Sequence, residues 1–314
     1  MSEDSDSSEP GWQDVLLRAI WPETGLRVVA AFTTDLAREA ARRHGAVGGA
    51  AAALGRGVTA GALLATITKS EERLTIEMSG GGPLGPLIID ANATGDVRAF
   101  IKNPGVPVAA LPGAHVSLCQ AMGRVGVVRV ARDLGLRETV NGQTALVDGE
   151  IDSDIEHYLA ASEQIPSALG CEALLGPELD VAVAAGLLLQ TLPNSDALPT
   201  LAAVRERLRS GALARALAQL PPGPPDPAAF AESLLGIGRG DLLCLDLRPL
   251  RFACPCSKQR AIATLSLLSL EDLSEMVREG RGAEVTCEFC RARHLISQPE
   301  LERARGEVAA VRPS

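Results

Sequence analysis

The decisive stretch of the sequence is FACPCSKQR, residues 252–260, in which two cysteines are separated by one residue. A second stretch, TCEFCRARH at residues 286–294, contains a Cys-x-x-Cys pair. The chain has only seven cysteines, and a structural cysteine needs no close neighbour because a buried thiol packs like a small hydrophobic group. Two tight pairs therefore indicate shared chemistry, which is metal binding, disulfide formation, or both in turn. The four residues are Cys254, Cys256, Cys287 and Cys290.

Zinc binding is the first hypothesis for these four residues. Two close pairs of thiolates joined by a small helical insert can close a tetrahedral site, which is the usual form of structural zinc. Within the insert, Ser269 followed by Asp272 predicts a helix start, and Gly280 predicts its end. A thioredoxin-like motif is one alternative, but its βαβ context is missing, and four unrelated core thiols are another. His294 is a further candidate ligand, although four thiolates already complete the shell.

The Cys-x-Cys spacing adds a redox argument. A disulfide between residues only two positions apart closes a very small ring, so it is strained and easily reduced. Such a bridge suits a switch better than a permanent crosslink. The sequence therefore predicts that Cys254 and Cys256 take part in reversible oxidation.

The rest of the chain predicts an α+β fold in three parts. Residues 12–193 mix strand and helix patterns without regular alternation, which favours an α+β core domain. Residues 194–250 form a helical linker, and residues 251–301 form a small zinc-binding redox-switch module. The strands are expected in residues 25–33, 73–80, 123–132 and 144–151, and residues 86–101 are expected to form two strands joined at a turn around residues 92–96. The helices are expected in residues 34–45, 153–164 and 180–190.

Within the linker, apolar residues at helical spacing predict one amphipathic helix over residues 201–220. Gly211 lies in its interior, which weakens such a helix by roughly 1 kcal/mol relative to alanine. The proline-rich PPGPPDP, residues 221–227, ends it, and Asp226 as N-cap starts a short helix that runs through Leu235.

Composition limits the classes of function. The formal net charge of −9 argues against nucleic acid as the main partner, because affinity for phosphates needs clustered Lys and Arg. The N-terminal MSEDSDSSEPGW lacks the basic and apolar parts of a secretory signal, which predicts a cytoplasmic protein. Residues 46–67 are the most membrane-like stretch, but Arg56 and several glycines make a spanning helix improbable.

Residues outside the paired cysteines offer little chemistry. Cys119, Cys171 and Cys244 have no close partner and are expected to be buried hydrophobic residues. The glycine-rich SGGGPLGP, residues 79–86, lacks the Lys-Ser/Thr of a phosphate-binding loop and predicts a turn between strands. No acid–base pair stands out, so we assign no catalytic residue and do not expect an enzyme.

Several segments together resemble one known family. The stretch Cys-x-Cys-Ser-x-x-Arg from Cys254 to Arg260 and the later Cys-x-x-Cys are similar to the zinc module of the redox-regulated 33 kDa heat-shock chaperone, the 33 kDa chaperonin. Upstream, residues 74–100, 158–167 and 184–193 are similar to core-domain segments of that family, in the family's order. The resemblance covers nearly the whole chain, from about Trp12 to Leu301.

The resemblance implies an ATP-independent holdase that captures unfolding proteins under oxidative stress. The family's reduced form holds one zinc ion through four thiolates and is inactive, whereas oxidation forms disulfides, expels zinc and loosens the linker. Carried over to this chain, the zinc ligands and redox-active thiols are the same four residues, with bridges Cys254–Cys256 and Cys287–Cys290. Unfolded client proteins are the implied partners, with a homodimer in the activated state and no role for nucleic acid or membrane.

Two other classes of function stay open. The first is a zinc module that docks nucleic acid or protein beside an unrelated effector domain, although the acidic charge and the strained Cys-x-Cys argue against it. The second is a thiol oxidoreductase, which turnover of disulfide substrates would reveal.

Overall fold

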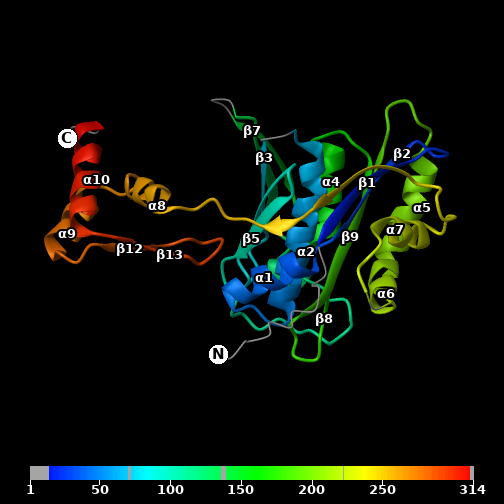
Figure 1. Ribbon diagram of the computed structural model, residues 1–314, viewed down its shortest axis with the longest axis horizontal. Coiled ribbons are helices and arrows are strands. Elements are labelled where there is room, and N and C mark those ends of the chain that lie inside the picture. Colours follow the sequence, from blue (N-terminus) through cyan, green and yellow to red (C-terminus); the bar gives the residue numbers. More distant parts are fainter. Residues whose placement is uncertain (1–13, 70–71, 136–138, 222, 312–314) are drawn as a thin grey trace, which may run out of the picture. The chain divides into compact units, whose positions relative to one another are not determined.

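The computed structural model of the chain describes residues 14–69, 72–135, 139–221 and 223–311. It contains both helices and mostly antiparallel sheets, which confirms the predicted α+β class (Figure 1). The chain divides into two compact units, Met1–Ala253 and Cys254–Ser314. The segment expected as a linker, residues 194–250, belongs to the first unit. The division into core, linker and switch module stays a prediction about how these parts act.

The first unit is built on two sheets. The five-stranded sheet is antiparallel, and its order is β10 (Leu243–Pro249), β1 (Val15–Trp21), β2 (Leu26–Phe32), β9 (Val181–Thr191) and β8 (Ser167–Leu175). The order of the six-stranded sheet is β11 (Arg251–Phe252), β5 (Asp96–Ile101), β4 (Leu87–Asn92), β3 (Arg73–Ser79), β6 (Val127–Asp133) and β7 (Thr139–Ala145). The predicted turn around residues 92–96 joins β4 to β5, and residues 79–86 form the predicted turn between β3 and β4.

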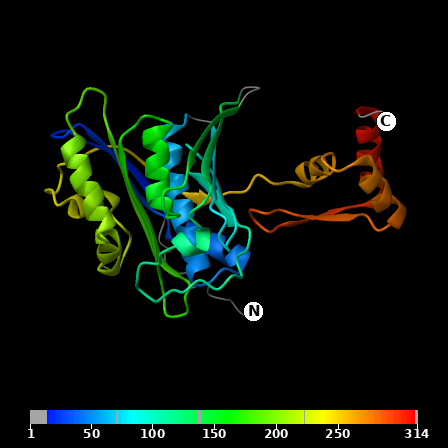
Figure 2. The same cartoon turned by 180° about the vertical axis from the view of Figure 1, so that it is seen from behind.

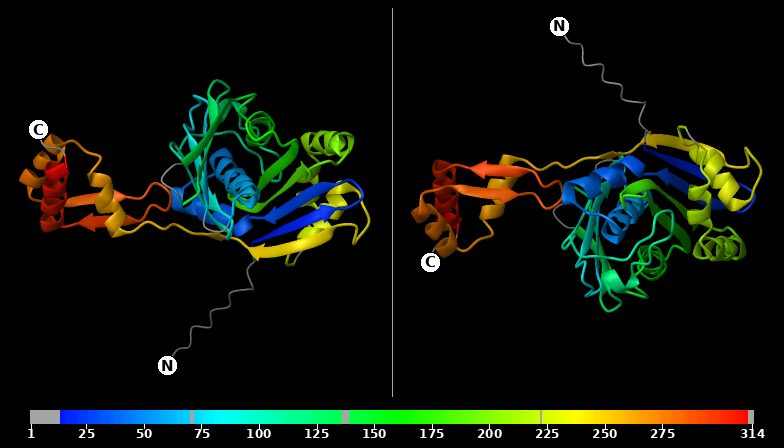
Figure 3. Two further views of the ribbon diagram at one scale, coloured as in Figure 1. Left: turned by 90° about the horizontal axis from the view of Figure 1, so that it is seen from above. Right: turned by 90° about the horizontal axis from the view of Figure 1, so that it is seen from below.

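Helix α2 (Gly49–Leu64) lies between the two sheets, where it contacts β8 and β9 of one and β4 and β5 of the other (Figure 3). Every residue of the helix is buried, and small residues let both sheets approach it. An added Cβ at Gly55 would meet Ala173 of β8, and one at Gly61 would meet Ile89 of β4. The stretch Gly49–Ile67 is apolar and long enough to cross a membrane, but most of it is buried inside this unit.

Most of the remaining helical elements of this part of the unit contact α2. Helix α1 packs against α2 and ends at Gly45, which has left-handed backbone as the sequence predicts, and α4 contacts β8. These elements are α1 (Thr34–His44), the 3₁₀ turn η1 (Ala65–Ile67), α3 (Cys119–Met122) and α4 (Ile151–Ala161).

Two predicted elements of the core are wrong. Residues 180–190 were expected as a helix, but they form the central strand β9. A strand buried on both faces shows a continuous apolar run without alternation, and periodicity alone does not separate such a run from a buried helix. Residues 144–151 were expected as a strand, but most of them form a loop whose Val147, Asp148 and Gly149 amides donate to the carboxylate of Asp154.

Three helices form a layer on the outer face of the five-stranded sheet, which we call the helical layer (Figure 2). They are α5 (Leu198–Arg209), α6 (Ala212–Ala218) and α7 (Pro227–Leu235). Leu208 and Leu213 pack against the backbone of β8 at Gly170, where an added Cβ would approach both side chains. Asp226 caps α7 by accepting hydrogen bonds from Ala228 and Ala229, as the sequence predicts.

The prediction of one continuous helix over residues 201–220 is wrong. The helix is interrupted at Gly211, whose φ of 80° is left-handed, and α6 starts directly after this corner. Glycine takes this backbone conformation without the steric cost that a Cβ brings. The glycine is therefore required for the corner between α5 and α6 and is not a weak point inside a helix.

The Gly211→Ala variant is expected to lower the free energy of unfolding of the first unit by about 1 kcal/mol, because alanine disfavours left-handed backbone. Urea unfolding monitored by circular dichroism measures the change. Gly306 is the opposite case, because it lies within a helix of the second unit and an added Cβ there meets nothing within 4 Å. The Gly306→Ala variant should stabilise that unit by up to about 1 kcal/mol. Equal effects of both substitutions would contradict this assignment of the corner.

The second unit contains α8 (Lys258–Leu265), α9 (Leu270–Glu279), the hairpin of β12 (Ala283–Thr286) and β13 (Arg293–Ile296), and α10 (Gln298–Val311). The predicted cap is confirmed, since Ser269 accepts a hydrogen bond from the Asp272 amide and α9 ends at left-handed Gly280. Helix α10 packs against α8 and α9 and contributes Leu301, Ala304 and Val308 to the small core of the unit.

Candidate metal centre

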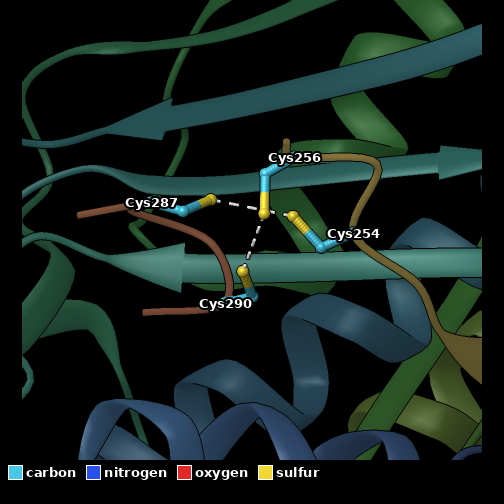
Figure 4. Close-up of side chains that lie close together, drawn as sticks. All are labelled: Cys254, Cys256, Cys287 and Cys290. Carbon is cyan, nitrogen blue, oxygen red and sulfur yellow. Dashed lines mark hydrogen bonds between the residues drawn. The ribbon is translucent and has the colours of Figure 1, made fainter. Parts of the chain in front are cut away.

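Four sulfur atoms from two separate segments meet in the second unit (Figure 4). Cys254 and Cys256 lie in extended chain that leads into α8, and Cys287 and Cys290 lie in the turn between β12 and β13. The two pairs are far apart in sequence, so they meet only because α8, α9 and the hairpin fold into one unit.

Local hydrogen bonds shape the turn that carries the second pair. The amide of Cys287 donates to the carbonyl of Ala292 at 2.9 Å, and the amide of Arg291 donates to the carbonyl of Cys287 at 2.8 Å. Arg291 has a left-handed φ of 60°, which closes the turn. The antiparallel pairing of β12 with β13 continues directly from it, so both thiols are held at the tip of a hairpin.

A helix cap follows directly after the first pair and restricts its position. The hydroxyl of Ser257 accepts a hydrogen bond from the amide of Arg260 at 3.2 Å and caps α8. A serine at this position satisfies one of the unpaired amides of the first helical turn. The Ser-x-x-Arg part of the sequence motif therefore starts a helix two residues after Cys256, which limits where that thiol can point.

The sulfur positions suit a tetrahedral metal ion. The Sγ atoms of Cys254 and Cys287 are 3.7 Å apart, those of Cys256 and Cys290 are 3.3 Å apart, and all four lie within 4.8 Å of one another. Four sulfurs bound at about 2.3 Å to one tetrahedral zinc ion would be separated by about 3.8 Å. The predicted residues are thus brought together in an arrangement that could hold a metal ion.

Electrostatics lead to the same conclusion. Burial raises the pKa of Cys256 and of Cys290, and neighbouring thiols such as Cys254 raise both pKa values further. Four thiolates so close together repel one another, so they do not ionise together without a cation among them. A bound divalent cation favours the thiolate form, which is the form that ligates metal.

The other cysteines lie outside this cluster. Cys171 is buried in β8, as predicted, and burial raises the pKa of its thiol well above the usual value. The same prediction is wrong for Cys244, which is exposed on β10, and for Cys119, which is partly exposed. Arg124 and Ser117 donate to the Sγ of Cys119, and these contacts lower the pKa of that thiol. His294 lies on β13 opposite Val285 and does not belong to the group of four thiols.

Sequence reasoning missed the segment that anchors the chain just before the first thiol pair. Strand β11 pairs in parallel with β5, and the guanidinium of Arg251 donates to the carboxylate of Asp96 at 2.6 Å. The ring of Phe252 packs on the core of the first unit beneath the guanidinium of Arg43, 4.8 Å from the ring centroid. Cys254 follows Phe252 by two residues. The first thiol pair is therefore directly preceded in the chain by a strand that pairs with β5.

Comparison with known proteins identifies relatives that match nearly the whole chain. Residues 14–297 match the family model described as Hsp33 protein. The chain is 35% identical over 294 residues to the 33 kDa chaperonin of Bacillus subtilis strain 168, which covers 94% of this chain and 99% of that protein. It is 34% identical to the 33 kDa chaperonin of Enterococcus faecalis strain V583, which covers 94% of this chain and 97% of that protein. The crystal structure of the 33 kDa chaperonin (heat shock protein 33 homologue) from Thermotoga maritima superposes with a TM-score of 0.78 at 26% identity and covers 95% of this chain and 99% of that one.

Proposed function

The chain belongs to the Hsp33 family of 33 kDa chaperonins, and from this premise we propose that it is an ATP-independent holdase switched on by oxidation of its cysteine cluster. Members of the family are chaperones and not enzymes, which agrees with the expectation that no residue is catalytic. The observation that carries the proposal is the convergence of four thiols within 4.8 Å. Unfolding proteins are the proposed clients, the activated form is proposed to be a homodimer, and the cytoplasm is the proposed location.

In the resting state, we expect Cys254, Cys256, Cys287 and Cys290 to be reduced and to hold one zinc ion per chain. Bound zinc would offset two of the four negative charges of the thiolates and crosslink the two segments that carry them. The chain's own contribution is to hold the four sulfurs close together through the α8 cap and the β12–β13 turn. The small core formed by α8, α9 and α10 supports this arrangement.

Oxidation changes the ligands themselves. Each disulfide forms when two thiols lose two electrons and two protons, and one hydrogen peroxide molecule takes them up to become two water molecules. We expect the pairs Cys254–Cys256 and Cys287–Cys290, which removes all four thiolates and releases zinc. The unit then depends on its core alone, which has few buried members.

The helical layer is the proposed source of the client-binding surface. Its apolar side chains cover one face of the five-stranded sheet in the resting state, so release of α5 and α6 would expose both surfaces. The helical layer is connected to the cysteine cluster along the chain, because β10 and β11 lie between α7 and Cys254. Exposed apolar surface of this kind binds other unfolding chains without any need for ATP.

Suppression of the aggregation of a thermally unfolding client, followed by light scattering, tests the proposal. The reduced, zinc-loaded protein should leave aggregation nearly unchanged, whereas protein treated with peroxide at elevated temperature should suppress it at about equimolar ratio. Equal activity of both forms would exclude redox control. Turnover of a disulfide substrate in place of holdase activity would favour an oxidoreductase.

The order of oxidation is a separate prediction. A Cys-x-x-Cys bridge is less strained than a Cys-x-Cys bridge, so Cys287–Cys290 should form before Cys254–Cys256. The shortest sulfur–sulfur distances join Cys254 to Cys287 and Cys256 to Cys290, so crossed pairs are the competing products. Mass-spectrometric mapping during mild peroxide exposure decides between them. Early accumulation of a Cys254–Cys256 bridge or of a crossed bridge would contradict the predicted order.

A further inference from the structure

A groove of about 620 Å³ lies between α6 and α7, which we call the α6–α7 groove. Leu220, Phe230 and Leu234 supply part of its apolar lining. Two features of this groove point to an occupant: the charge at its rim, and its position near the start of the described chain.

The rim of the groove is positively charged. Its charged lining residues are Arg207, Arg215, Arg239 and Asp226. Asp226 pairs with Arg239 at 3.0 Å, whereas the hydrogen bonds of Arg207 and Arg215 go to main-chain carbonyls and to the hydroxyl of Ser210. In the part of the chain that the structure describes, no carboxylate lies within ion-pair distance of Arg207 or Arg215. A protein of net charge −9 thus presents two unmatched guanidinium groups beside an apolar groove.

The chain itself contains a segment of complementary chemistry. Residues 1–13 precede the described residues and carry Glu3, Asp4, Asp6 and Glu9 with no Lys or Arg. Trp12 adds one large apolar side chain near the end of this segment. The match to the family model starts at residue 14, so these residues lie outside the matched range.

The segment starts from a point close to the groove. Val15 of β1 pairs with Phe32 of β2, and the Phe32 ring lies 5.0 Å from the ring of Phe230, which lines the groove. Thirteen extended residues reach up to about 43 Å, so the tether does not confine the acidic residues to the start of β1.

The arginines of α1 are also near the start of β1, but each of them already has a carboxylate partner. Arg38 pairs with Asp35, and Arg42 and Arg43 pair with Glu39, all within the same helix. An acidic segment therefore gains less from contact with α1 than from contact with the groove.

We infer that residues 1–13 bind in the α6–α7 groove of their own chain, with carboxylates on Arg207 and Arg215 and Trp12 against the apolar lining. Tethering gives the segment an effective concentration of about a millimolar, so even weak contacts keep the groove occupied. While they are bound, residues 1–13 compete with other peptides that have acidic and apolar side chains for the α6–α7 groove.

Binding of a fluorescein-labelled peptide of residues 1–13, measured by fluorescence anisotropy, tests the inference with two forms of the protein. A form that lacks residues 2–13 should bind the peptide saturably at low salt, and high salt should weaken this binding because it screens the charges. The full chain should bind at least about tenfold more weakly, because its own segment competes at high effective concentration. Equal affinity of the two forms, or no saturable binding to the shortened form, would overturn the inference.

Variants of the shortened form locate the contact. The double variant Arg207→Ala, Arg215→Ala should weaken peptide binding by about tenfold, as expected for the loss of two charge-assisted contacts. Arg42→Ala is the matched control, because it removes an exposed helical arginine of the same unit that already has a partner. A loss of binding in Arg42→Ala without one in the double variant would place the peptide on α1 and refute the proposed site. Circular dichroism confirms that both variants fold.

Discussion

The Leu208→Asp variant is expected to suppress client aggregation in its reduced, zinc-loaded form, at a level close to that of the oxidised wild type. Leu208 is 9% exposed and packs with Leu213 over Gly170 of β8. Removing a buried leucine of this kind costs about 2–5 kcal/mol, and an aspartate at the same place must also lose its hydration. The corner between α5 and α6 is then held on the sheet by fewer buried side chains, so its release costs less free energy.

Leu198→Asp is the matched control for this variant. Leu198 opens the same helix but is 56% exposed, so its replacement by aspartate should leave the resting state inactive. Metal analysis of Leu208→Asp should still give one zinc ion per chain, because the cysteine cluster lies in the other unit. An inactive Leu208→Asp protein with zinc bound and native helix content would show that release of the helical layer is not the switch.

The second large effect is expected at the metal centre. Wild-type protein purified under reducing conditions should contain one zinc ion per chain, and the Cys290→Ser variant should contain less than half of that. Serine does not supply the thiolate that a zinc ion prefers, and three remaining sulfurs leave the tetrahedral shell open. Apparent binding energies of structural zinc sites are about 10–16 kcal/mol, so metal loss should also unfold much of the second unit.

Cys244→Ser is the control for the metal prediction. Cys244 is exposed on β10 and does not belong to the cysteine cluster, so this variant should keep its zinc and its stability. Metal content measured by mass spectrometry checks both variants, together with far-ultraviolet circular dichroism, which detects loss of the helices α8, α9 and α10. A fully reduced wild type with half a zinc ion or less per chain would contradict the proposed resting state.

Local chemistry made several elements predictable. The caps at Ser269 and Asp226, the glycine ends at Gly45 and Gly280, and the turn that joins β4 to β5 all follow from hydrogen bonds or backbone preferences within a few residues. The same holds for the two thiol pairs, because their short spacings alone indicate shared chemistry.

Elements whose environment comes from distant parts of the chain were not predictable in this way. Strand β9 is apolar along nearly its whole length because α2 covers one face and the helical layer covers the other, so its pattern does not separate strand from helix. Strands β1 and β10 were missed, although they pair with each other across more than two hundred residues. Gly211 looked like a helix interior because its neighbours have helical spacing on both sides of the corner.

The sequence by itself was enough to predict an α+β fold and a shared role for four of the cysteines, and to indicate which family the chain resembles. Those conclusions depend on residue types and short spacings, which are local properties. Only the tertiary structure decided that Cys254 and Cys256 meet Cys287 and Cys290 within 4.8 Å, and that residues 194–250 pack as part of the first unit. Both outcomes depend on apolar faces that find their partners far along the chain, and burial of such faces is a property of the whole fold.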